Sequence, residues 1–247
     1  MAVNKGDFIL LNYTCKIKES GETVDTTVEK IAKDAKLHKE GTSYEPRFVV
    51  VGEGWVPKGL DESFIGLETG KTVSVEVPPE KGHGSRDPSK IKLLPLRRFK
   101  AEGLAPAPGL QVEIDGRPAL VRAVGAGRVQ VDFNHPLAGK TLIYEVSVEK
   151  VLQTQDEKVK AIIHRRIPNI SVEKFATTIM EREVNIEIPE EAFLLEGLQV
   201  AKRVISNDLQ KYFQEIAKVS FIEIFKKAAP VAAEAKPEQV QVSEGTR

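Results

Sequence analysis

The side chains that most often carry nucleophilic or metal-dependent chemistry are scarce in this sequence. Cys15 is the single cysteine among 247 residues, and the four histidines are His38, His83, His135 and His164. No histidine lies near the cysteine at the spacing of a zinc site. We therefore expect no metal and no cofactor. Cys15 cannot form an intrachain disulfide, and we expect it to be a small packed residue of a strand.

A more informative stretch runs from Val131 to Leu142 and contains an Asn134-His135-Pro136 corner followed by Gly139. Asn and Pro favour turns, and the residue before Pro is pushed out of the helical region. The corner therefore predicts the end of one extended segment and the start of another, from Thr141 to Val148. Any β-rich protein could contain such a corner, so the corner alone assigns no chemistry.

Several side chains could line a pocket, but each has a simpler interpretation when it is taken alone. Tyr13, Val49 and Tyr144 lie in apolar or alternating runs, where core packing is the ordinary role. Asp25 follows a short strand, where a carboxylate is most often a solvated turn residue. Only the ordered set of these residues points to a functional site.

That ordered set resembles the SlyD-like members of the FKBP-type peptidyl-prolyl isomerases. Besides the corner, the resemblance is carried in chain order by Tyr13, Val24-Asp25, Val49-Val50-Val51-Gly52, Val56-Pro57-Lys58-Gly59-Leu60, Gly82-His83-Gly84 and Leu142-Ile143-Tyr144. It covers residues 5–152. Beyond them, the overall organisation resembles that of the long archaeal FKBP-type proteins.

The resemblance implies a pocket that accelerates rotation about X-Pro bonds. Tyr13, Asp25 and Tyr144 are the implied catalytic residues, and Asp25 would either interact with the rotating amide or hold Tyr13 by a hydrogen bond. The implied substrate-binding residues also include Val24, Val49, Val56, Pro57, Leu60 and His83, with Leu60 at the floor, where many relatives have Trp.

Two positions depart from the family pattern. His83 stands where the family usually has a Tyr that donates to the substrate carbonyl, and an imidazole titrates near neutrality. Pro57 stands where a backbone N–H usually reaches the substrate, and proline has none. We predict an active isomerase with chaperone activity toward unfolded clients that contain X-Pro bonds. The alternative is a non-enzymatic holdase with a degenerate pocket.

Charge and hydropathy exclude several other classes of function. Charged residues make up 29% of the chain and balance to a net charge of +0, which disfavours a nucleic-acid binder. Residues 1–7 contain no apolar signal region, and no run approaches the ~18 apolar residues of a membrane span. We expect a cytoplasmic protein without membrane or nucleic-acid partners.

The pattern along the chain predicts an α+β fold, with an FKBP-type antiparallel sheet wrapped on a short helix. Residues 1–84 and 132–152 would form this isomerase domain. Alternating or apolar runs predict strands at 7–17, 23–27, 48–51, 72–77 and 141–149. Helical spacing predicts short helices at 28–37 and 59–67.

Residues 85–131 would form a small inserted β domain that binds clients, the insert-in-flap domain of SlyD-like members. We expect an extended segment at 91–98 and strands at 110–114, 119–124 and 128–133, with Asp115-Gly116 as a hairpin turn. Val112, Ile114, Val121 and Val129 are expected to form its core. Leu94, Leu96, Phe99 and Leu104 are the candidates for exposed client contacts.

Residues 153–227 would form a C-terminal α+β domain that makes the protein a homodimer. We expect a strand at 159–167, a helix capped by Ser171, strands at 184–188 and 219–225, and a long helix that Pro189 opens. Its wide apolar surface needs cover, and a unit of ~75 residues has a limited core of its own. Residues 228–247 lack a core-forming pattern and are expected to be a disordered tail.

Overall fold

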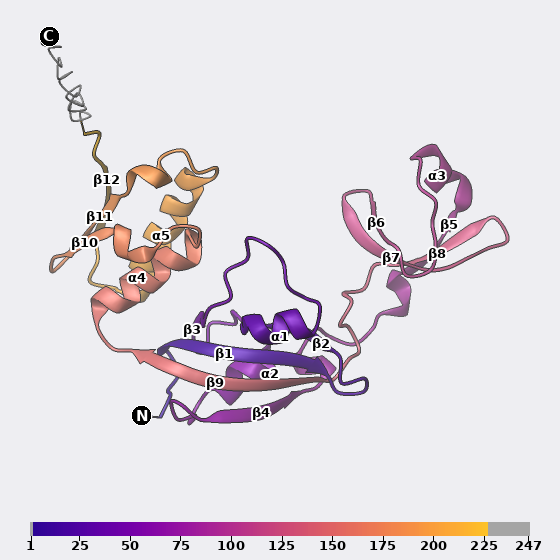
Figure 1. Ribbon diagram of the computed structural model, residues 1–247, viewed down its shortest axis with the longest axis horizontal. Helices are drawn as coiled ribbons and strands as arrows, with labels where there is room; N and C mark the ends of the chain where they lie inside the picture. The colour runs from indigo at the N-terminus through magenta and orange to yellow at the C-terminus, as the bar shows by residue number, and fades with distance from the viewer. Residues whose placement is uncertain (1, 227–247) are drawn as a thin grey trace, which may run out of the picture. The chain divides into compact units, whose positions relative to one another are not determined.

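The computed structural model describes residues 2–226 (Figure 1), so the predicted tail at 228–247 lies outside the described residues. The chain divides into an N-terminal unit that ends at Asn169 and a C-terminal unit that begins at Ile170. Among residues 2–226, no helix has the length and apolar character to cross a membrane. The cytoplasmic location stays a prediction.

A five-stranded antiparallel sheet, here called the core sheet, dominates the N-terminal unit (Figure 1). Its order is β2-β1-β9-β4, and β3 also pairs with β1. Alternation along β1 places Ile9, Leu11, Tyr13 and Cys15 on one buried face. The five strands are β1 (Phe8–Ile17), β2 (Thr23–Thr26), β3 (Arg47–Val50), β4 (Thr72–Val77) and β9 (Leu142–Leu152).

Two short strands share one edge of β1, because β9 occupies the other edge along its whole length. β3 pairs with the first half of β1, where Leu11 lies opposite Arg47, and β2 pairs with the second half, where Cys15 lies opposite Asp25. Tyr13 lies between the two pairings. The chain between β2 and β3 contains α1 (Glu29–Asp34) and the 35–46 loop.

The helix α2 (Lys58–Ser63) covers the core sheet with Leu60, and Phe64 follows it into the same buried cluster. Asp61 is buried on this helix and accepts hydrogen bonds from the backbone N–H groups of Gly52 and Gly54, at 2.8 and 3.0 Å. Such bonds satisfy a carboxylate that burial would otherwise penalise. They also fix the turn that leads from β3 to Val56.

The inserted sheet is antiparallel with the order β5-β8-β7-β6. Asp115 and Gly116 both have positive φ, as a two-residue hairpin turn of the mirror-image type requires. Phe99, Val112, Ile114, Val121 and Val129 form its buried core. Its elements are β5 (Ile91–Pro95), α3 (Leu96–Ala101), β6 (Gln111–Ile114), β7 (Arg117–Gly125) and β8 (Arg128–Asp132), preceded by the 3-10 turns η1 (Pro79–Lys81) and η2 (Pro88–Lys90).

The Asn-His-Pro corner holds together the two connecting segments, one on each side of the inserted sheet, that join it to the core sheet. Asn134 accepts from the backbone N–H of Asp87 and donates to its carbonyl, both at 2.9 Å. Asp132 is 2% exposed, accepts from Asn134 at 2.8 Å and forms ion pairs with Arg86 and Arg122. The corner that carries part of the family resemblance thus has a structural role at this junction.

The strand predicted at 159–167 is wrong, because these residues belong to the helix α4 (Gln155–Arg166). Thr154 and Glu157 form a reciprocal capping box at its start, and Val159, Ile162 and Ile163 are buried at helical spacing. The apolar run resembles a strand because Val159, Ile162 and Ile163 are β-branched, and such residues favour strands over helices. Lys158 lies over the Phe8 ring at 5.3 Å, so α4 packs on the core sheet.

The C-terminal unit contains a three-stranded sheet in the order β10 (Ala176–Ile179), β11 (Glu183–Ile188) and β12 (Lys218–Glu223). β11 and β12 are parallel and are joined through the helix α5 (Leu198–Tyr212). The helix predicted after Ser171 is wrong: a single 3-10 turn without a side-chain cap leads into a strand that contains Thr177 and Thr178. The helix expected from Pro189 begins only at Leu198, because Gly197 has a left-handed conformation (φ 78°).

The elements of the C-terminal unit are η3 (Val172–Lys174), β10 (Ala176–Ile179), β11 (Glu183–Ile188), η4 (Glu190–Ala192), α5 (Leu198–Tyr212) and β12 (Lys218–Glu223). Leu198, Ile205 and Leu209 are the buried residues of α5. Together the core sheet, the inserted sheet and the C-terminal sheet confirm the predicted α+β fold class.

Candidate functional site

The polar centre of the candidate site is a hydrogen bond from the Tyr13 hydroxyl to Asp25 Oδ2, 2.5 Å long. Tyr13 is 4% exposed, whereas Asp25 lies at the exposed edge of β2. Burial, followed by the bond to Asp25, raises the pKa of Tyr13 above its ordinary range. The hydroxyl therefore keeps its proton and holds one carboxylate oxygen in place.

Tyr144 on β9 lies beside this pair, with its ring centroid 6.0 Å from that of Tyr13 and the rings tilted by 52°. Burial, and then its hydrogen bond with Cys15, raises the pKa of Tyr144 above its ordinary range. Burial also raises the pKa of the Cys15 thiol. Cys15 is 1% exposed, which confirms the packed role expected for it.

The structure gathers the predicted apolar residues in one place. Val49, Val56 and Leu60 belong to the same buried cluster as Tyr13 and Tyr144, and each of these five residues is at most 9% exposed. Val24 packs on the cluster and is half-buried. The chain therefore brings together a buried apolar floor and one fixed polar group, while the roles of these residues in binding stay predictions.

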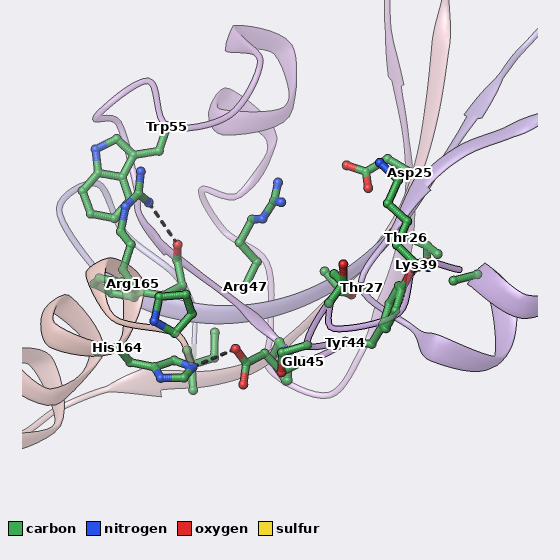
Figure 2. A pocket seen from close by; sticks show the side chains of 18 of the residues that line it. Asp25, Thr26, Thr27, Lys39, Tyr44, Glu45, Arg47, Trp55, His164 and Arg165 are labelled. Carbon is green, nitrogen blue, oxygen red and sulfur yellow. Dashed lines mark hydrogen bonds and ion pairs between the residues drawn. The ribbon is translucent and has the colours of Figure 1, made fainter. Parts of the chain in front are cut away.

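A cavity of about 770 Å³ opens beside Val24 and Asp25 (Figure 2). It is walled by the 37–46 loop, the start of β3, Trp55 and the end of α4. His164 of α4 pairs with Glu45 at 2.7 Å, and the Arg165 guanidinium lies 3.5 Å from the centre of the Trp55 ring. Residues that lie far apart in the sequence of the N-terminal unit thus enclose one space.

Sequence reasoning missed most of this wall. Arg47 directly precedes the buried run of β3, and its guanidinium lies 5.2 Å from the centre of the Tyr13 ring. A cation next to an apolar strand was the available signal for Arg47, and Trp55, the single tryptophan, was the signal beside Val56. Arg165 could not be placed, because α4 was predicted as a strand.

Of the site residues predicted at the core sheet, Val24 and Asp25 line the cavity, whereas Tyr13, Val49, Val56, Leu60 and Tyr144 belong to the buried cluster and are not part of its wall. His83 and Pro57 belong to neither group. His83 stacks on His135, with centroids 4.1 Å apart and planes 3° from parallel. Burial, with the charge of His135 as the smaller cause, lowers the pKa of His83. Pro57 precedes α2 and accepts hydrogen bonds from the N–H groups of Leu60 and Asp61, so its place in the chain is that of a helix start.

The four candidates for exposed client contacts lie in the inserted sheet, away from the Tyr13 cluster. The exposure expected for Phe99 is wrong, because this residue is 2% exposed at the centre of the inserted core. Leu94, Leu96 and Leu104 are partly buried against the same core. Phe99 faces inward because α3 replaces the end of the extended segment expected at 91–98.

Two family models match separate parts of the chain. The model described as "FKBP26, IF domain" matches residues 92–137, and the model described as "FKBP26_C-terminal" matches residues 155–226. The first match covers most of the inserted sheet, and the second covers α4 and the C-terminal unit.

Curated relatives match the remaining part of the chain as well. A short-type peptidyl-prolyl cis-trans isomerase of Methanocaldococcus jannaschii is 35% identical over 155 residues, which are 63% of this chain and 98% of that protein. The FKBP-type isomerase SlyD of Aeromonas hydrophila is 30% identical, over 63% of this chain and 68% of the relative. An FKBP-type 16 kDa isomerase of Escherichia coli is 26% identical, over 61% and 94%.

Proposed function

This chain belongs to the FKBP-type peptidyl-prolyl cis-trans isomerases, and we propose that its reaction takes place where the Tyr13–Asp25 hydrogen bond meets the cavity. As a peptidyl-prolyl isomerase it acts on polypeptides that contain X-Pro bonds. The observation that carries the proposal is a fixed carboxylate standing between a buried apolar floor and an open space.

The reaction requires neither a nucleophile nor a bond cleavage. Rotation about a peptide bond meets a barrier of ~18–20 kcal/mol, because amide resonance must be broken. An enzyme accelerates it by binding the twisted amide more tightly than the planar one. The carbonyl oxygen of the twisted amide carries less charge, so a site with few waters favours it relative to bulk water.

The residues divide this task between them. The half-buried Val24 packs on the cluster that contains Val56, Leu60 and Tyr144, and we assign the proline ring to this apolar region. Asp25 faces the rotating amide from the exposed edge of β2, and Tyr13 holds its carboxylate at 2.5 Å. Because the hydroxyl is already bound, Asp25 needs little reorganisation when the substrate twists.

Removing the Tyr13 hydroxyl tests the role assigned to its hydrogen bond with Asp25. Tyr13→Phe keeps the ring and removes the bond to Asp25, so we expect kcat/KM on a short Leu-Pro peptide to fall about tenfold, the effect of ~1.4 kcal/mol. Tyr212→Phe, the same change in the C-terminal unit, is the matched control. Equal kcat/KM in the wild type and Tyr13→Phe would exclude this hydrogen bond from the reaction.

We also propose that the inserted sheet binds unfolded clients, which gives the protein its chaperone activity. Leu93 on the edge strand β5 is 58% exposed, and Leu110 and Val124 are 40% and 38% exposed. An open sheet edge with exposed aliphatic side chains can pair with an extended peptide. A holdase without catalysis would use this surface alone.

A homodimer formed through the C-terminal unit is our third proposal. Leu194, Phe225 and Val200 are 97%, 76% and 68% exposed, and Phe193 contacts the Phe225 ring at 4.9 Å. Exposed apolar side chains of this kind are typical of interaction surfaces. Two linked copies would present two pockets to one client and gain avidity without new contacts.

A further inference from the structure

The wall of the cavity beside Asp25 is cationic, although the whole chain is neutral. Lys39, Arg47, Arg165 and Arg166 line it, and we call these four residues the cationic wall. The acidic residues of the lining are Asp25 and Glu45, which leaves a net charge of +2 when His164 is neutral. Low-dielectric walls concentrate such a field within a cleft.

Both acidic residues already have partners. Glu45 pairs with His164 at 2.7 Å, and Asp25 accepts from Tyr13 at 2.5 Å. Arg47 has no carboxylate partner among residues 2–226; its contact there is the face of the Tyr13 ring, at 5.2 Å. Arg47 is exposed, and Figure 2 shows its side chain pointing into the cavity between Asp25 and the Trp55–Arg165 pair.

The position of Arg47 decides which part of a substrate it can reach. Arg47 and Asp25 flank Tyr13 on the same edge of β1. If the proline ring lies on the apolar floor and the rotating amide lies at Asp25, a substrate that runs along this edge of β1 brings the residue before proline to Arg47. This assignment rests on the function proposed above for the cavity.

We infer that this isomerase prefers X-Pro bonds in which X is Glu or Asp, and that Arg47 is the specificity-determining residue that binds the carboxylate. A guanidinium matches a carboxylate with two parallel hydrogen bonds, a geometry that lysine does not reproduce. Arg165, which lies over the Trp55 ring, adds positive charge to the same cavity from the end of α4. Asp25 repels an acidic side chain, but its charge is outweighed by the four cations of the wall.

The experiment compares three short peptides that differ only in the residue before proline: Glu, its neutral isostere Gln, and Lys. Exchange NMR measures the isomerisation rates, so that no coupling protease adds a preference of its own. For the full chain we expect kcat/KM for the Glu-Pro peptide to exceed that for the Gln-Pro peptide about fivefold, as a partly exposed charge pair provides. Raising the salt from about 0.1 to about 1 M should reduce this ratio.

Variants of Arg47 test the assignment to this residue. Arg47→Leu should bring the Glu/Gln ratio to about one, Arg47→Lys should keep part of it, and Arg47→Glu should favour the Lys-Pro peptide. Arg203→Leu, the same change on the exposed face of α5, should leave the ratio unchanged.

The Glu/Gln ratio distinguishes a failure of the inferred preference from a failure of the proposed function. If the full chain isomerises the Gln-Pro peptide well but shows a Glu/Gln ratio of one, the inference is overturned while the proposed function stands. A ratio that stays near five in Arg47→Leu also overturns it, because the preference would then arise elsewhere. If no peptide is isomerised, the function proposed for the cavity fails together with the inference.

Discussion

The core sheet and the inserted sheet have the same kind of packing but differ in what they leave accessible. Each is an antiparallel sheet that buries one apolar cluster. The core cluster includes Tyr13, Cys15 and Tyr144, and a cavity opens at its edge. The inserted cluster contains Phe99 and small aliphatic residues, and it leaves Leu93 and Leu110 on the outside. This difference supports the two proposals made above, that the core sheet holds the reacting amide and that the inserted sheet offers a surface to clients.

Removing the inserted sheet should produce the largest effect. Replacing residues 88–131 by a short Gly-rich loop keeps Asp87, Asp132 and Asn134, which clamp the junction. We expect proline-limited refolding of a protein client to slow on the order of 100-fold, because a tethered second site raises the effective concentration of the client. The isomerisation rate of a short peptide should change less than about threefold.

An equal loss in both assays would mean that the inserted sheet supports the pocket instead of capturing clients. Leu93→Ser and Leu110→Ser provide a milder version of the same comparison, since both side chains are exposed and their loss should not unfold the sheet. In these variants only the refolding of the protein client should slow.

The next largest effect should come from the apolar wall of the core site. Tyr144→Ala removes a ring that is 5% exposed, and we expect kcat/KM on a short Leu-Pro peptide to fall about 50-fold, or ~2.3 kcal/mol. Asp25→Ala should cost about tenfold. Tyr144→Phe keeps the ring and should retain activity within about threefold, which controls for misfolding of the Ala variant.

The junction between the two sheets should be sensitive to one buried carboxylate. Asp132→Ala leaves Arg86 and Arg122 without their shared partner and removes the acceptor of the Asn134 bonds. Breaking a buried ion pair costs about 3–5 kcal/mol, and the two arginine side chains are 33% and 40% exposed, so we expect about 2 kcal/mol. Urea unfolding measures this loss.

Asp115→Ala provides the control for that measurement, because Asp115 pairs with Arg98 on the exposed side of the inserted sheet. It should change the free energy of unfolding by less than about 1 kcal/mol. If Asp132→Ala behaves like Asp115→Ala, the corner does not hold the sheets together.

Much of the core sheet could be predicted from the sequence, because alternation along 7–17 and 141–149 reports a sheet with one buried face. The Asp115-Gly116 turn was predictable for a similar reason, since two adjacent positive φ angles require such residues. Most of the cavity wall could not be predicted, because Glu45, Arg47 and Arg165 come from a loop, a strand end and a helix. No single hydrophobic periodicity in the sequence relates these three positions. Of these three, only Arg165 depends on the capping box that revealed α4.

The next prediction concerns the homodimer that we propose for the C-terminal unit. Leu194→Glu combined with Val200→Glu places charges on exposed apolar positions, and we expect a protein that sediments as a dimer to become a monomer. Ile65→Glu makes the same change at an exposed position of the N-terminal unit and should leave the dimer intact. A full-length wild-type monomer at tens of micromolar would refute self-association.

The smallest effect should come from the stacked histidines. Since the pKa of His83 is lowered in the folded state, its contribution to stability is present above the ordinary value of about 6.5 and is lost as the pH falls toward the folded value. The test compares the melting temperatures of the wild type and of His83→Phe at about pH 7.5 and at about pH 5.5, a range over which a histidine changes its charge. We expect acidification to lower the melting temperature of the wild type slightly more than that of the variant. Parallel pH profiles of the two proteins would show that the stacking has no such consequence.

The central claim is that the site at the core sheet performs the isomerisation without the inserted sheet. Exchange NMR on a short Leu-Pro peptide tests it most directly, with the full chain, the chain that lacks residues 88–131 and the Tyr144→Ala variant measured side by side. We expect the first two to isomerise the peptide at rates within about threefold of each other and Tyr144→Ala to be about 50-fold slower. Loss of activity on removal of the inserted sheet, with Tyr144→Ala unaffected, would contradict the account.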